Sequence, residues 1–71
     1  MNKQFRAKLH GKYYAVVEDS MGSIEVFCFE DENTDTDNKR YENGNYFEDP
    51  IFATKALNEI LNIFKHYKSK L

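Results

Sequence analysis

The chain has few of the residues that usually brace a small fold. It is 71 residues long and contains one cysteine, one proline, three glycines and no tryptophan. Because Cys28 has no second cysteine to pair with, an internal disulfide is excluded, and a chain this short buries only about 60% of the surface that its unfolded form exposes. Eleven Phe and Tyr side chains partly compensate, since each buries roughly 150–250 Å². We expect a single domain over residues 1–71, for which self-association is a further source of stability.

Long apolar runs are absent as well. No stretch approaches the roughly 18 residues that a membrane span needs. The first ten residues carry charge but lack the apolar core of a signal peptide. A single unpaired thiol fits a reducing compartment. We therefore expect a cytoplasmic protein that does not contact a membrane.

Basic residues are scarce in the middle of the chain. Eleven of the twelve acidic residues lie between Glu18 and Asp49, a stretch with two basic residues and a formal charge of −9. The residues before this stretch carry +4, and the residues after it carry +3. Charge segregated in this way creates a field that steers a charged partner. It is the main functional signal of the sequence, although it names no specific activity.

Three runs near the N-terminus predict strands. Residues 4–9 alternate apolar and basic side chains, which is typical of a half-buried strand with a basic outer face. Residues 12–18 are rich in Tyr and Val, and residues 23–30 alternate again. His10-Gly11 and residues 19–22 provide the turns. The three runs therefore predict an antiparallel meander.

The second half of the chain predicts a long helix. Asp49 is a favourable N-cap and Pro50 suits the first helical position, so the helix is expected to run from there to about Ser69. Before it, residues 30–38 are predicted to form an acidic loop. Asn43-Gly44 is a strong hairpin signal and predicts a small hairpin or a fourth strand.

Together these elements predict an α+β fold. A three- or four-stranded antiparallel meander carries one C-terminal amphipathic helix packed on one face. Because one helix covers only one face of a sheet, aromatic side chains on the other face are expected to form a contact surface. The apolar stripe of the helix has heptad spacing, which suits either packing on its own sheet, the reading we favour, or helix pairing in a homodimer; it comprises Leu57, Ile60, Phe64, Tyr67 and Leu71.

The acidic loop also has the spacing of a calcium-binding loop, at Asp31, Asn33, Asp35, Asp37 and Glu42. Two features speak against calcium. Position 6 of the loop is Thr36, where the sharp bend requires glycine, and the preceding element is a predicted strand, not a helix. We therefore expect no metal site and no cofactor.

The sequence offers no catalytic constellation. Cys28, the only thiol, lies in the middle of a predicted strand, where cysteine is usually packing material. His10 lies in a predicted turn and His66 near a helix end, and no spacing pairs either of them with Cys28. The glycines are isolated and form no phosphate-binding loop. We therefore expect a protein that is not an enzyme and has no catalytic residues.

Two alternatives concern the basic first strand and the helix. Arg6, Lys8 and Lys12 could form a basic stripe beside Tyr13 that binds nucleic acid, as three-stranded sheets backed by one helix do in arm-type integrase and AP2-like domains. A charged first strand is more often a protected sheet edge. A structural homodimer without a charged partner is the other alternative.

The leading hypothesis rests on the carboxylates. If they gather on one side of the folded chain, they imitate the regularly spaced phosphates of a nucleic acid and compete for a basic groove. Glu30, Asp31, Glu32, Asp35 and Asp37 would then supply the charge. Aromatic residues carry much of the energy of protein interfaces, so the expected anchors are Tyr41, Tyr46 and Phe47.

With its short single domain, its meander and helix, and its acidic run Glu30-Asp31-Glu32-Asn33-Thr34-Asp35-Thr36-Asp37, the chain resembles small inhibitors encoded by phages and mobile elements, including anti-CRISPR proteins. The resemblance implies a stoichiometric inhibitor without catalytic activity. It would block a host protein that has a basic nucleic-acid-binding surface, and it would not bind nucleic acid itself.

Overall fold

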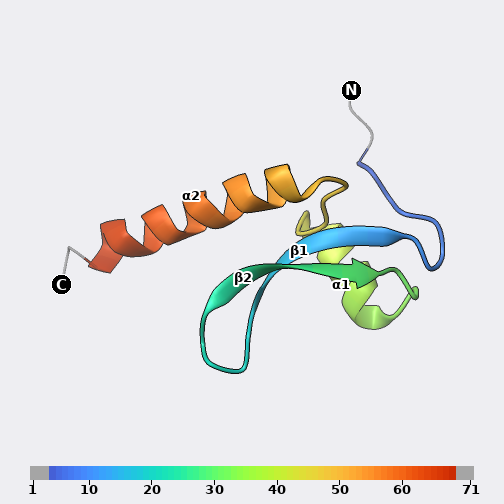
Figure 1. The fold of residues 1–71 in the computed structure, drawn as a ribbon, viewed down its shortest axis with the longest axis horizontal. Helices are drawn as coiled ribbons and strands as arrows, with labels where there is room; N and C mark the ends of the chain where they lie inside the picture. The colour runs from blue at the N-terminus through green and yellow to red at the C-terminus, as the bar shows by residue number, and fades with distance from the viewer. Residues whose placement is uncertain (1–3, 69–71) are drawn as a thin grey trace.

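The computed structural model of the chain describes residues 4–68 and has an α+β fold. Along the chain its elements are β1 (Lys12–Glu18), β2 (Ile24–Glu30), α1 (Asp35–Asn43) and α2 (Pro50–Lys68). The long α2 runs along one side of the β1–β2 hairpin and the short α1 lies on the other side (Figure 1). The predicted α+β class is confirmed. The sheet, however, has two strands where three or four were predicted, and two helices are present among the described residues where one was predicted.

The β1–β2 hairpin matches the second and third predicted strands. The strands pair antiparallel in a register that runs from Lys12↔Glu30 to Glu18↔Ile24. Asp19 closes the turn, because its carboxylate accepts hydrogen bonds from the backbone N–H groups of Met21 at 2.8 Å and Ser23 at 2.9 Å. Tyr and Val are favoured on paired, pleated strands, so the composition of β1 agrees with its structure.

The prediction of a first strand over residues 4–9 is wrong. These residues pair with no strand. Instead the backbone N–H of Ala7 donates to the hydroxyl of Tyr46 at 2.9 Å, so a side chain satisfies it. At the turn that follows, the N–H of Gly11 donates to the carbonyl of Lys8, and a Cβ on Gly11 would lie 2.8 Å from that oxygen. The alternating pattern therefore reflects packing of one side of an irregular segment on the core.

The predicted fourth strand is reduced to a single bridge at the outer edge of β1. Tyr14 and Phe47 exchange two backbone hydrogen bonds of 2.8 Å. Beside them, the side-chain amide of Asn45 accepts from the N–H of Val16 at 2.8 Å and donates to its carbonyl at 2.7 Å. Because one side chain takes the place of a backbone ladder, no regular strand forms here, yet the edge of β1 is closed.

Residues 35–43 form α1, which corrects both the predicted acidic loop over residues 30–38 and the predicted hairpin at Asn43-Gly44. Thr34 and Asp37 form a capping box, in which each side chain accepts a hydrogen bond from the backbone N–H of the other. Gly44 ends the helix with a φ of 84°. A glycine at a helix C-terminus and a glycine in a type I′ turn both need positive φ, so the Asn-Gly pair alone does not distinguish them.

The core lies on the face of the hairpin that α1 covers. Tyr13, Ala15 and Tyr46 are buried there. The rings of Tyr13 and Tyr46 stack with centroids 4.0 Å apart and an interplanar angle of 10°. Around them pack partly buried apolar side chains from four segments, namely Phe5, Ala7, Val17, Phe29 and Tyr41. Aromatic stacking thus supplies the core that aliphatic residues provide in larger domains.

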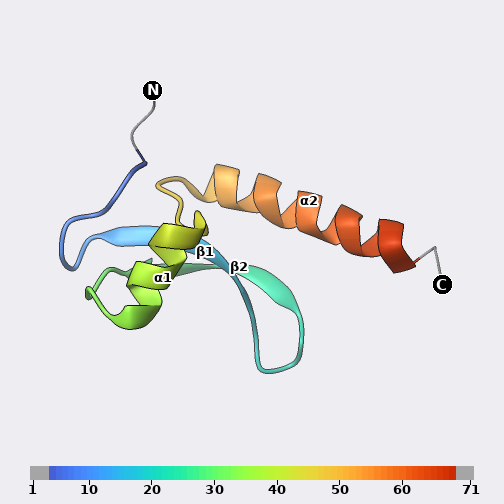
Figure 2. The same cartoon turned by 180° about the vertical axis from the view of Figure 1, so that it is seen from behind.

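The predicted start of α2 is confirmed. Pro50 is its first residue, and the carboxylate of Asp49 accepts from the N–H of Ile51 at 2.8 Å. The predicted end at Ser69 lies outside the described residues. Seen from behind, the N-terminal half of α2 lies along the hairpin, and its C-terminal half extends beyond the hairpin (Figure 2).

α2 lies against the face of the hairpin opposite the core. Val16 of β1 lines a pocket of about 270 Å³ together with Ala56 and Ile60 of α2, and Ala53 is fully buried. Both faces of the hairpin are therefore contacted, one by α2 and the other by α1 and the N-terminal segment. The expectation of exposed aromatic side chains on the face away from α2 holds for Phe27, which is 39% exposed, but not for Tyr13, which is buried. Cys28 is exposed, so it is not the packing residue that its place in the strand suggested.

Candidate functional site

Asp31 anchors the segment that connects β2 to α1. Its carboxylate is 2% exposed and accepts hydrogen bonds from Arg6 Nε at 2.7 Å, from Arg6 Nη2 at 3.2 Å and from the Tyr46 hydroxyl at 2.7 Å. It also accepts from the N–H of Asn33 at 2.9 Å. The guanidinium of Arg6 lies over the ring of Tyr41, 4.6 Å from its centroid. A buried carboxylate satisfied in this way fixes the chain around it.

Asp37 is a second anchor, in the first turn of α1. It is 5% exposed, and it accepts from the Tyr13 hydroxyl, from the N–H of Glu32 at 2.9 Å and from the Thr34 hydroxyl at 2.9 Å. Arg40 donates to the same Tyr13 hydroxyl at 2.9 Å. The two aspartates thus join the acidic segment to β1 and to the core.

Both anchors are ionised at neutral pH. The hydrogen-bonded Arg6 guanidinium lowers the pKa of the Asp31 carboxyl to about 2. Burial acts to raise the pKa of Asp37, but hydrogen bonds from Tyr13, Glu32 and Thr34 outweigh it and the pKa lies below its ordinary value. Burial, together with the bond to Asp31, raises the pKa of Tyr46 to about 12.

The structure divides the five acidic residues expected to bind a partner into two groups. Asp31 and Asp37 are buried and point inward, whereas Glu30, Glu32 and Asp35 are exposed. Because the inward carboxylates hold the backbone, the outward carboxylates project from a fixed frame. The acidic segment is therefore an ordered connection and not a free loop.

The three aromatic residues expected to act as anchors for a partner belong mainly to the core. Tyr46 is buried, and Tyr41 and Phe47 are partly buried. The ring of Tyr41 contacts Tyr46 edge to face at 5.4 Å between centroids. These side chains hold the fold together in this conformation. A partner could reach only the exposed edges of Tyr41 and Phe47.

The basic residues of the alternative nucleic-acid hypothesis do not form one stripe. The guanidinium of Arg6 forms an ion pair with Asp31 and also donates to the Asn38 side chain at 2.8 Å. Lys8 and Lys12 are exposed, and Lys12 lies across from Glu30 in the hairpin. The basic face predicted for the first strand is thus partly neutralised by acidic neighbours.

One group of possible metal ligands occurs among the described residues, formed by His10, Glu30 and Glu32. One ligand atom from each lies within 4.8 Å of the other two, and all three residues are exposed. His10 Nδ1 is already 3.0 Å from a carboxylate oxygen of Glu32. The direct contact between His10 and Glu32 accounts for the proximity of these side chains.

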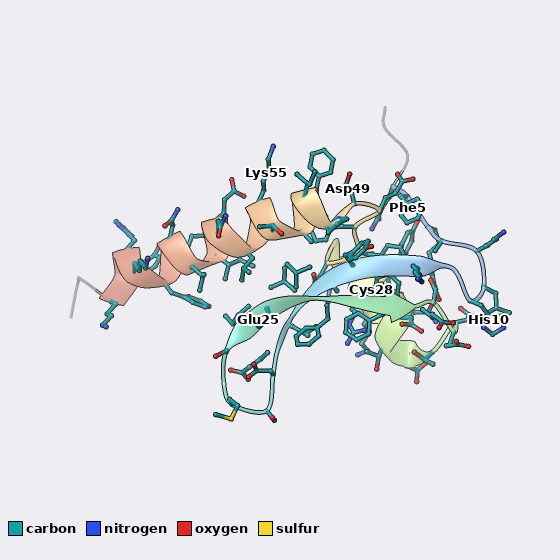
Figure 3. The ribbon with its side chains drawn as sticks, viewed as in Figure 1. Phe5, His10, Glu25, Cys28, Asp49 and Lys55 are labelled. Atoms are coloured by element: carbon teal, nitrogen blue, oxygen red, sulfur yellow. The ribbon has the colours of Figure 1, made fainter. Side chains whose placement is uncertain are left out.

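The exposed carboxylates of the hairpin and of the segment that follows it lie at both ends of the hairpin, not in one patch. Glu18 pairs with Ile24, at the other end of the strands from Glu30. Six residue steps separate Ile24 from Glu30, which corresponds to about 20 Å. In Figure 3, Glu25 lies near the β1–β2 turn and His10, the neighbour of Glu32, lies at the opposite end. The end that contains Glu30, Glu32 and Asp35 will be called the pinned acidic end.

α2 exposes apolar side chains along a stripe that was expected to pack on the sheet. Its C-terminal half exposes Leu61, Ile63, Phe64 and Tyr67. The heptad pattern included Phe64 and Tyr67 but could not show where the sheet ends beneath them. None of the described helices combines the length and apolar character that crossing a membrane requires.

Comparisons with known protein families, with curated proteins and with solved structures find no match for this chain.

Proposed function

We propose that this protein is a small, non-catalytic binding module that occupies a basic surface of another protein. The observation that carries the proposal is the pinned acidic end. There, the buried Asp31 and Asp37 hold the backbone while Glu30, Glu32 and Asp35 face solvent. Carboxylates on a fixed frame lose little conformational entropy on binding, because the segment is already ordered.

The partner class follows from the charge. A surface that attracts several carboxylates carries Lys and Arg side chains, and grooves that bind nucleic acid are the common surfaces of that kind. A module that fills such a groove competes with the nucleic acid and inhibits its partner without chemistry. This is the role that the resemblance to anti-CRISPR-like phage inhibitors implies. The proposal places the protein in the cytoplasm together with such a partner.

Exposed charge acts chiefly on the rate of association. Opposite charges on two surfaces raise the association rate by steering encounters, and salt screens this effect. The pinned acidic end should therefore give binding that weakens as ionic strength rises. Because the carboxylates at the turn end lie about 20 Å away, they contribute less to the same contact and provide a matched control.

The test is capture from nuclease-treated lysate of the source cell, followed by kinetics with the captured protein. In the test variant, Glu30, Glu32 and Asp35 are each replaced by Lys. The control variant carries Glu18→Lys with Glu25→Lys. We expect the association rate of the test variant at low salt to be lower by a factor of about ten or more, with a flatter salt dependence. The association rate of the control variant should change much less.

Competition identifies the partner class. Nucleic acid should displace this protein from the captured partner, and this protein alone should cause no shift of DNA or RNA on a low-salt gel. Capture that is unaffected by reversal of the three charges, or a partner with no affinity for nucleic acid, would overturn the proposal.

A further inference from the structure

The apolar stripe of α2 continues past the surface that covers it. In the N-terminal half of the helix, Ala53 is buried and Leu57 and Ile60 are partly buried. The stripe then continues with Phe64, 54% exposed, and Tyr67, 66% exposed. Leu61, 37% exposed, and Ile63, 53% exposed, widen it on either side. The same face of one helix is thus covered over its first half and bare over its second.

The chain exposes more surface than a compact monomer of its size. The accessible area of the chain is 5754 Å², whereas a compact monomer of 8.4 kDa exposes about 4600 Å². This excess of about 1100 Å² over the whole chain is comparable to the roughly 800 Å² that each partner buries in a standard interface, and the bare half of α2 contributes part of it. The radius of gyration, 13.5 Å, is likewise larger than the about 11 Å of a compact 71-residue domain.

We propose that the bare half of α2 binds the bare half of α2 from a second copy of this chain, with the two helices antiparallel. A twofold axis brings identical patches together, so a self-complementary apolar stripe needs no other partner. The spacing of Leu57, Ile60, Phe64 and Tyr67 alternates three and four residues, which is the pattern that interlocks between paired helices. The bare aromatic residues Phe64 and Tyr67 would lie near the axis.

The position of the hairpin favours the antiparallel arrangement. The hairpin covers the N-terminal half of α2, where Ala53 is buried, and the bare half extends beyond it (Figure 1). Parallel helices would bring the hairpins of both copies to the same end of the pair, where they compete for space. Antiparallel helices carry the two hairpins to opposite ends and leave the bare halves free to meet.

This inference does not rest on the proposed function, since the pinned acidic end and the bare half of α2 share no residue. The test is sedimentation equilibrium of the full chain from about 1 μM to 1 mM. We expect a monomer–dimer equilibrium for the native chain. Phe64→Glu should weaken dimerisation at least about 30-fold, because an aromatic residue at an interface centre typically contributes that much.

The matched control is Ile51→Glu, which places the same charge at another exposed apolar position of α2, 61% exposed. It should leave the dimer intact. Both substitutions are at exposed positions, so circular dichroism should show unchanged secondary structure for each. A native chain that stays monomeric throughout the range overturns the proposal, as does a Phe64→Glu variant that dimerises normally through another surface, such as the open edge of β2.

Orientation is tested with a spin label at Asn58→Cys in a Cys28→Ser background. In the antiparallel dimer the two labels are separated by about 20 Å along the helix axis, because the helix rises about 1.5 Å per residue from the twofold axis. In a parallel dimer they lie side by side at the spacing of the two helices, about 10 Å. A short distance between the labels refutes the antiparallel arrangement.

Discussion

The buried carboxylate of Asp31 is the residue on which the pinned acidic end depends. Replacing Asp31 by Asn removes the negative charge that faces Arg6 and replaces one accepting oxygen by an amide nitrogen. We expect the free energy of unfolding at pH 7 to fall by about 2–4 kcal/mol, because breaking a largely buried ion pair leaves its partner uncompensated. Urea unfolding measures the change. Glu32→Gln, an exposed neutral substitution next to it, should change stability by less than about 0.5 kcal/mol.

The same ion pair predicts a pH dependence with a definite sign. The pKa of Asp31 is lowered from 3.8 to about 2 in the folded chain, so folding favours the ionised form. The stability that it contributes, about 2 kcal/mol for a shift of this size, is present above pH 4 and is lost as the pH falls through 2. The stability difference between the native chain and Asp31→Asn should therefore shrink over that window. A difference that stays constant between pH 7 and pH 2 would show that the pair does not carry the effect.

At the scale of the element, α1 depends on its capping box more than on helix propensity. Its sequence contains Asp, Thr and Asn, which are weak helix formers, and nine residues are too few for a helix that is stable alone. Thr34→Ala removes the hydroxyl that accepts from the N–H of Asp37. We expect a loss of about 1 kcal/mol, and a melting temperature lower by about 4–8 °C.

Thr36→Ala is the matched control for that prediction. Thr36 lies in the first turn of α1, is exposed and makes no side-chain hydrogen bond in the structure. Its replacement by Ala, the better helix former, should leave stability unchanged or slightly higher. Equal losses in the two variants would mean that propensity, and not the cap, governs this helix.

The elements that were predicted correctly are those with a local signal. The Tyr- and Val-rich composition of β1, the alternation in β2 and the Asp49-Pro50 start of α2 act within a few residues. The helix α1 was missed although its end signals are also local. Thr34 and Asp37 have the spacing of a capping box, but Asp is a less usual partner than Glu in that motif.

The burial of Asp31 and Asp37 could not be predicted from the residues next to them. Asp31 accepts hydrogen bonds from Arg6, 25 positions earlier in the chain, and Asp37 accepts one from Tyr13, 24 positions earlier. No composition or spacing rule identifies which carboxylates in an acidic run will be paired in this way. Glu30, Glu32 and Asp35 were expected in a partner surface and are exposed, but whether they bind a partner stays a prediction.

At the scale of the whole molecule, the two proposed surfaces reinforce each other. The pinned acidic end lies at the end of the hairpin away from the β1–β2 turn, and the bare half of α2 extends beyond the hairpin on the side of that turn (Figure 1). Pairing through α2 would therefore leave the acidic ends of both copies free. Two linked acidic surfaces bind a repetitive basic groove more tightly than one, because the second contact is intramolecular.

The division of α2 into a covered and a bare half predicts two levels of stability along one helix. Residues 53–60 gain stability from contact with the hairpin, whereas residues 62–68 at low concentration are held only by continuation of the helix, which is marginal for short segments. In amide hydrogen exchange at about 10 μM, residues 62–68 should exchange at least about tenfold faster than residues 56–60. Raising the concentration to about 1 mM should slow exchange in residues 62–68 of the native chain but not of Phe64→Glu, because only the native chain then buries that half against a second copy. Uniform protection along α2 at every concentration would mean that the C-terminal half needs no cover, and the large exposed area would then be an intrinsic property of the monomer.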